Sequence, residues 1–152
     1  MTTATIRRPG DGEPNRAFAL PRTFLLTAAD TDGAFSLWRE TVPPGAGPPL
    51  HRHVGQRELF QVASGRLLFA CEDERVELTA GAVILIPPGA RHAFVNVGDE
   101  AAEIVVTTTP GGAEGFFREV EQAGLEPPGD MAKIVEIAAR YGLEFTGPPL
   151  HP

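Results

Sequence analysis

Turn-forming residues recur at short intervals through the middle of this chain, between residues 43 and 112. The densest run is PPGAGPPL at residues 43–50, which holds four prolines and two glycines in eight residues. Proline lacks the backbone N–H that a helix or a central strand needs, so this run is a stiff loop. The intervals between the turns leave room only for short strands, which predicts an all-β sandwich or closed barrel.

The segments between these turns show the patterns of strands. In residues 34–42, Trp38 and Glu40 share one face, whereas Leu37 and Arg39 share the other. Residues 82–86 form a continuous apolar run, which predicts a strand buried on both faces.

The pattern changes after residue 110. Residues 113–123 and 131–141 place apolar side chains at helical spacing, which predicts a helical cover packed on the barrel. The chain has 152 residues, which indicates one domain. We therefore expect a flexible polar arm at 1–16, a β-barrel at 17–110 and a C-terminal helical extension at 111–152.

Composition narrows the classes of partner and compartment. The formal net charge is −7 and no cluster of Lys and Arg is long enough to follow phosphates, so nucleic acid is not an expected partner. Cys71 is the single cysteine, which excludes an intrachain disulfide and fits a reducing cytoplasm. The sequence has no secretory signal and no long apolar run, so we expect a cytoplasmic protein with no membrane segment.

Four side chains at close spacing point to a metal site. His51 and His53 are two residues apart, so in a strand both imidazoles face the same side. Glu58 begins the next apolar segment, and His92 follows a Pro-Gly turn. Three imidazoles and one carboxylate suit one divalent transition metal, and iron, manganese, nickel, copper and zinc all remain open.

The two stretches that carry these residues resemble the two sequence motifs of the cupins. The first stretch is GAGPPLHRHVGQRELFQVASG at residues 45–65, and the second is GAVILIPPGARHAFVN at residues 81–96. The ten motif positions are Gly45, His51, His53, Glu58, Gly65, Gly81, Pro87, Gly89, His92 and Asn96. The wider chain is similar to small single-domain cupins of the quercetin-dioxygenase-like group.

The resemblance implies a cupin-type double-stranded β-helix, or jelly-roll barrel, with a short C-terminal helical cover. It also implies that His51, His53, Glu58 and His92 are the metal ligands, and barrels of this family are often homodimers. Glu58 is the candidate catalytic base, since a carboxylate is able both to bind a metal and to take a proton. Phe60, Phe94 and Arg39 are the candidates for lining a substrate pocket.

Four protein ligands leave positions open on a metal that accepts five or six, which is typical of a catalytic site. We therefore expect a metal-dependent enzyme that acts on a small oxygenated compound, either aromatic or enolisable. Dioxygenase-type oxidative chemistry is the first expectation. The alternatives are a Lewis-acid cyclase, isomerase or decarboxylase without redox chemistry, and a non-catalytic module that binds a small ligand.

Overall fold

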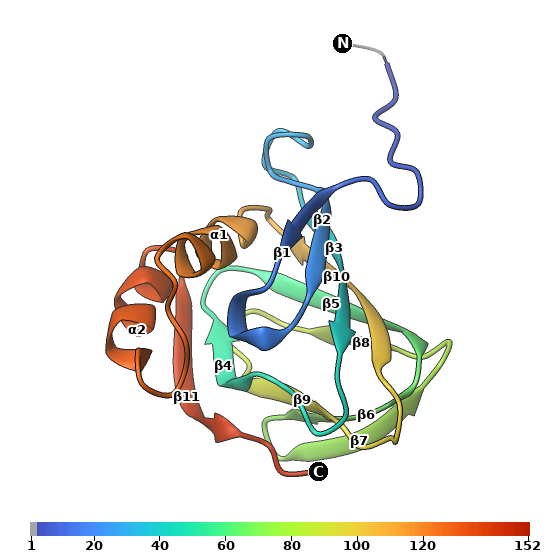
Figure 1. The fold of residues 1–152 in the computed structure, drawn as a ribbon, viewed down its shortest axis with the longest axis vertical. Coiled ribbons are helices and arrows are strands. Elements are labelled where there is room, and N and C mark those ends of the chain that lie inside the picture. The colour runs from blue at the N-terminus through green and yellow to red at the C-terminus, as the bar shows by residue number, and fades with distance from the viewer. Residues whose placement is uncertain (1–2) are drawn as a thin grey trace.

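The computed structural model describes residues 3–152. Met1 and Thr2, which belong to the expected N-terminal arm, lie outside the described residues. Two antiparallel sheets face each other around an apolar interior, and two helices lie at one side of them (Figure 1). This arrangement confirms the predicted all-β barrel with a short helical portion.

The first sheet has six strands in the order β1-β2-β3-β10-β5-β8. Their bounds are Glu13–Asn15, Arg22–Leu26, Ser36–Val42, Ala102–Thr109, Arg57–Ser64 and Val83–Ile86, in that order. The second sheet has five strands in the order β11-β4-β9-β6-β7. Their bounds are Leu143–Pro149, Pro49–His53, His92–Asn96, Arg66–Cys71 and Glu74–Thr79. Neighbouring strands in each sheet are thus often far apart in the sequence.

The core lies between the inner faces of the two sheets and is rich in aromatic rings. Phe60 of β5 lies 5.3 Å from Phe69 of β6 and 5.6 Å from Phe94 of β9, measured between ring centroids. Trp38 of β3 is also buried, as its alternation with exposed residues predicts. These rings join the two sheets by burying apolar area that each sheet alone would expose.

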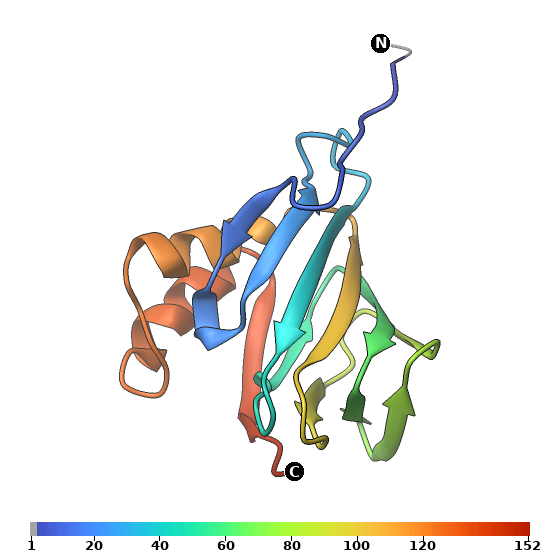
Figure 2. The same ribbon diagram turned by 45° about the vertical axis from the view of Figure 1, so that its right-hand side comes forward.

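The C-terminal segment contains both helices and a strand. Helix α1 spans Glu114–Gln122 and helix α2 spans Met131–Ala139, and both lie beside the N-terminal strands and β11 (Figure 2). Their buried side chains, Phe116 and Val120 in α1 and Ile134 in α2, recur at the helical spacing seen in the sequence. Strand β11 pairs with β4, so this segment also completes the second sheet.

The N-terminal segment also contributes to the barrel. Strand β1 pairs with β2, and Asn15 within it is only 2% exposed. A short 3-10 turn, η1 (Ala17–Ala19), then leads into β2. None of the helices in residues 3–152 has the length and apolar character that crossing a bilayer requires.

The prediction that residues 82–86 form a strand buried on both faces is wrong. Strand β8 lies at the edge of the six-stranded sheet, and Val83 and Leu85 are 62% and 59% exposed. Only Ile86 is buried. An apolar run does not tell a central strand from an edge strand whose outer face has no cover.

Candidate metal centre

Strand β4 carries two of the four predicted ligands. His51 and His53 alternate with exposed Arg52, so both imidazoles point into the barrel, where their residues are 8% and 7% exposed. His92 of β9 lies directly opposite His51 in the antiparallel pair. The ring centroids of these two histidines are 4.3 Å apart, and those of His53 and His92 are 5.7 Å apart.

Glu58 reaches the three histidines from the other sheet. Its Oε1 lies 2.8 Å from Nε2 of His92, and its Oε2 lies 3.4 Å from Nε2 of His53. One ligand atom from each of the four residues lies within 4.8 Å of the others. The structure therefore brings together all four residues that the sequence analysis selected as metal ligands.

The proline- and glycine-rich loop before β4 is held against β9. Asn96 donates its backbone N–H to the carbonyl of Ala46 at 3.0 Å, and its own carbonyl accepts the N–H of Gly45 at 3.0 Å. A Cβ atom on Gly47 would lie 1.9 Å from the carbonyl oxygen of Phe94. Only glycine permits this approach, which positions the start of the strand that carries His51.

Backbone carbonyls orient two of the imidazole rings. Nδ1 of His51 lies 2.8 Å from the carbonyl oxygen of Pro49, and Nδ1 of His92 lies 3.0 Å from that of Ala90. A carbonyl only accepts, so each Nδ1 carries a proton. Nε2 of His51 then holds the free lone pair of a neutral ring, whereas Nε2 of His92 faces the carboxylate of Glu58 at 2.8 Å. This arrangement is common in metal-binding histidines.

Charge and burial set the protonation states of the group. Burial and the neighbouring His92 and His53 lower the pKa of His51 to about 3, so its ring is neutral at pH 7. Burial also acts to lower the pKa of His53, but the carboxylate of Glu58 outweighs it and raises that pKa. Burial opposes ionisation of Glu58, yet the adjacent His53 and His92 hold its pKa well below the usual range. Glu58 is therefore an anion in the barrel.

The chemistry of these residues fits a metal ion. Neither buried ring nitrogen of His53 makes a well-aligned hydrogen bond among residues 3–152, although Nε2 lies 3.4 Å from Oε2 of Glu58. Leaving such atoms unpaired costs about 1–3 kcal/mol, whereas coordination of one nitrogen would remove part of that cost. A buried carboxylate among three imidazoles likewise calls for a cation. The group could thus hold one divalent transition metal, whose identity the donor set leaves open.

A mostly apolar cavity adjoins this group. His51, His53 and Glu58 line it together with Phe60 and Phe94, the two phenylalanines selected as pocket candidates. Arg39, the third pocket candidate, does not line this cavity and is exposed. That expectation is corrected by the alternation of β3, which turns Arg39 outward and its neighbours Trp38 and Glu40 inward.

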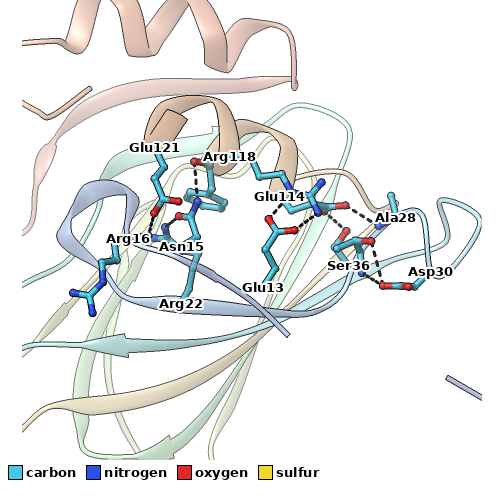
Figure 3. Close-up of polar contacts among 12 residues, drawn as sticks. Glu13, Asn15, Arg16, Arg22, Ala28, Asp30, Ser36, Glu114, Arg118 and Glu121 are labelled. Carbon is cyan, nitrogen blue, oxygen red and sulfur yellow. Dashed lines mark hydrogen bonds and ion pairs between the residues drawn. The ribbon is translucent and has the colours of Figure 1, made fainter. Parts of the chain in front are cut away.

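Sequence reasoning missed a second polar cluster in the cavity wall, formed by Arg22, Glu40 and Trp38. Oε2 of Glu40 accepts from Nε of Arg22 at 3.3 Å and from Nε1 of Trp38 at 3.1 Å. Arg22 also donates to Oδ1 of Asn15 at 2.8 Å (Figure 3) and lies over the ring of Phe117, 4.0 Å from its centroid. The one sequence signal for this cluster was that Glu40 lies two residues after Trp38, which places a charged side chain on the same strand face as a tryptophan.

Polar contacts join helix α1 to β1, to β3 and to the segment that follows β2 (Figure 3). Glu114, only 3% exposed, accepts from the backbone N–H of Ala28 at 2.7 Å and from the hydroxyl of Ser36 at 2.5 Å. Arg118 pairs with Glu13 at 2.6 Å, which joins the helix to β1. Since Phe116 and Phe117 of this helix line the cavity, these contacts also determine its shape.

Comparison with known proteins supports the fold that the motifs predict. The family model for the cupin domain matches residues 38–108. A predicted oxalate decarboxylase from Thermotoga maritima, known as a crystal structure, superposes with a TM-score of 0.64 over 70% of this chain and 99% of its own, at 24% identity. The barrel has the cupin fold. These matches support the cupin superfamily, while specificity of the quercetin-dioxygenase type stays a prediction.

Two relatives are similar in sequence. An uncharacterized protein from Methanocaldococcus jannaschii is 32% identical over 75 residues, which are 49% of this chain and 60% of that protein. Polyketide synthase CurC from Streptomyces cyaneus is 36% identical over 100 residues, or 64% of each chain. The matched segments span less than two thirds of both relatives.

Proposed function

We propose that this cupin protein is a metal-dependent enzyme that acts on a small oxygenated compound. The observation that carries the proposal is the position of His51, His53 and Glu58 in the wall of an apolar cavity. A metal bound there would act as a Lewis acid or bind dioxygen, depending on its identity. The apolar wall would exclude water, and the anionic Glu58 would hold or take a proton of the substrate.

Two forms of this chemistry compete. Dioxygenase-type oxidation follows from the resemblance of the motifs to quercetin-dioxygenase-like cupins. The alternative is non-redox chemistry, such as the cyclisation of a polyketide, and one relative at 36% identity is a polyketide synthase. Both forms need an enolic or phenolic oxygen on the substrate, so both predict the same class of compound.

Metal analysis followed by substrate screening tests the proposal. The purified protein is assayed for metal content and then incubated, with and without oxygen, with catechols, flavonols and β-diketones, and the products are read by mass spectrometry. We expect conversion by the wild type, loss of conversion in Glu58→Gln, and full conversion in Glu77→Gln, which changes an exposed glutamate on β7. Conversion that needs oxygen identifies the oxidative form, and conversion without oxygen identifies the Lewis-acid form. A wild-type protein that takes up no metal would overturn the proposal.

A further inference from the structure

Only one of the two carboxylate oxygens of Glu40 accepts hydrogen bonds from the described residues. Oε2 accepts both hydrogen bonds that the carboxylate receives, from Arg22 and from Trp38, and Oε1 takes none from residues 3–152. Glu40 is 5% exposed and Arg22 is 4% exposed, so the pair is buried in the cavity wall rather than solvated. A carboxylate oxygen that has no hydrogen-bond partner in a cavity wall is commonly matched by a ligand or a water.

Glu40 and the metal group lie at different levels of the same cavity. In the six-stranded sheet, Glu58 of β5 is paired opposite Thr108 of β10. Thr108 is in turn paired opposite Ser36 of β3. Glu40 lies four residues further along β3, about 13 Å of strand at the rise of a β-strand. A ligand that contacts both groups therefore needs polar atoms at two opposite ends.

The space between these two ends is small and apolar. The cavity has a free volume of about 50 Å³. That is room for roughly three or four waters, which limits the ligand to a compact one. The wall between the polar ends includes Phe60, Phe94 and Phe117, which suit the faces and edges of a flat ring.

We propose that Glu40 is a second substrate-binding point, which holds a hydroxyl group of a compact single-ring compound whose other oxygens face the metal group. The proposal rests on the proposed function, because it takes the metal group to bind the other end. A hydroxyl fits Oε1 in either protonation state of Glu40, since it both donates and accepts. A carboxylate at this end of the ligand would be repelled by Glu40 whenever Glu40 is ionised, and is disfavoured.

A matched pair of ligands tests this directly. Kojic acid and allomaltol are pyrones that chelate metals through the same hydroxyketone, and they differ by one hydroxyl at the opposite side of the ring. Both are titrated by calorimetry into zinc-loaded protein whose metal content is checked before and after. We expect wild-type protein to bind kojic acid about tenfold more tightly, the effect of a hydrogen bond to a charged group.

Three variants assign the preference to Glu40. In Glu40→Gln the amide oxygen should take the place of Oε2, because Arg22 and Trp38 both donate to that position. The amide NH₂ then takes the place of Oε1, and the preference for kojic acid should fall several-fold. Arg22→Met/Glu40→Met removes both charges together, so no unpaired charge is left buried. The ratio of the affinities for kojic acid and allomaltol should then fall to about one. Glu103→Gln changes a carboxylate bound to Thr41 and should keep the wild-type preference.

The outcomes separate this proposal from the proposed function. If the protein takes up metal fully but binds the two pyrones equally, or binds neither, the role of Glu40 is overturned and the proposed function is not. A preference that persists in both cavity variants also overturns it. Failure to take up metal overturns both proposals.

Discussion

His51 of β4 and His92 of β9 lie directly opposite each other in an antiparallel pair, with their ring centroids 4.3 Å apart. Residues so placed in two neighbouring strands keep their separation as long as the sheet is intact. Glu58 reaches the pair from the facing sheet, and its Oε1 is 2.8 Å from Nε2 of His92. The candidate metal group thus depends on the closure of the barrel, since its members come from both sheets.

Removal of one imidazole should abolish tight metal binding. In His51→Ala the group loses one of its three nitrogens, and we expect the affinity for zinc to fall by at least about 100-fold. His151→Ala changes an exposed histidine near the end of the chain and should bind zinc as the wild type does. Metal content after dialysis, measured by elemental analysis, distinguishes these results. Equal zinc in both variants would contradict the assignment of His51.

Metal affinity should rise with pH across the neutral range. Glu58 raises the pKa of His53 in the folded protein above its ordinary value of 6.5, so below that pKa the ring carries a proton that competes with the metal. The pKa of Glu58 is lowered, so this carboxylate stays ionised over the same range. We expect the affinity to fall about tenfold per pH unit below the pKa of His53 and to level off above it. Competition with a chromophoric chelator between about pH 5 and 8 measures this, and a flat profile would contradict it.

The buried pair of Arg22 and Glu40 should be important for stability. In Arg22→Met, Glu40 stays buried without its cation, which should reduce the free energy of unfolding by about 3–5 kcal/mol. The double variant Arg22→Met/Glu40→Met should recover much of this loss. Arg66→Met removes an ion pair whose side chains are 55% and 47% exposed, and should cost less than about 1 kcal/mol. Urea unfolding compares the three, and similar losses in Arg22→Met and Arg66→Met would refute the buried pair's role.

Phe18 should control access of solvent to the cavity. It lines the cavity on one side and a surface groove on the other, and its ring lies 5.8 Å from Phe116 and 6.0 Å from Phe145 between centroids. Trp38, the single tryptophan of the chain, lines the same cavity and reports on its exposure. Phe18→Ala should increase acrylamide quenching of Trp38 several-fold, because the wall is opened.

The control for this measurement is Val83→Ala, which trims an exposed side chain on β8. Quenching should be unchanged there. If a folded Phe18→Ala protein showed the quenching of the wild type, Phe18 would not separate the cavity from solvent.

The four candidate ligands were predictable because strand periodicity and turn spacing are local. The two-residue spacing of His51 and His53 alone places both on one strand face. The barrel itself was predictable for the same reason, since its turns are marked by Pro and Gly. That Glu58 approaches His92 from the facing sheet was not predicted, because the spacing of the residues does not tell which strands face each other.

Features that depend on which strands become neighbours were not predictable. Arg22 meets Glu40 because β2 pairs with β3 in the register that sets these two residues opposite each other. The exposure of Val83 follows from the edge position of β8, and an apolar run looks the same at an edge or in the centre. Arg39 was selected as a pocket residue for its charge alone. Which face of β3 points into the barrel is decided by packing, and Arg39 lies on the outer face.

Crystals grown with zinc, with an anomalous difference map recorded at the zinc absorption edge, test the central claim most directly. We predict one peak about 2.0–2.2 Å from a nitrogen of each of His51, His53 and His92 and from an oxygen of Glu58. A zinc ion found elsewhere, with these four side chains bound to no ion, would contradict the account.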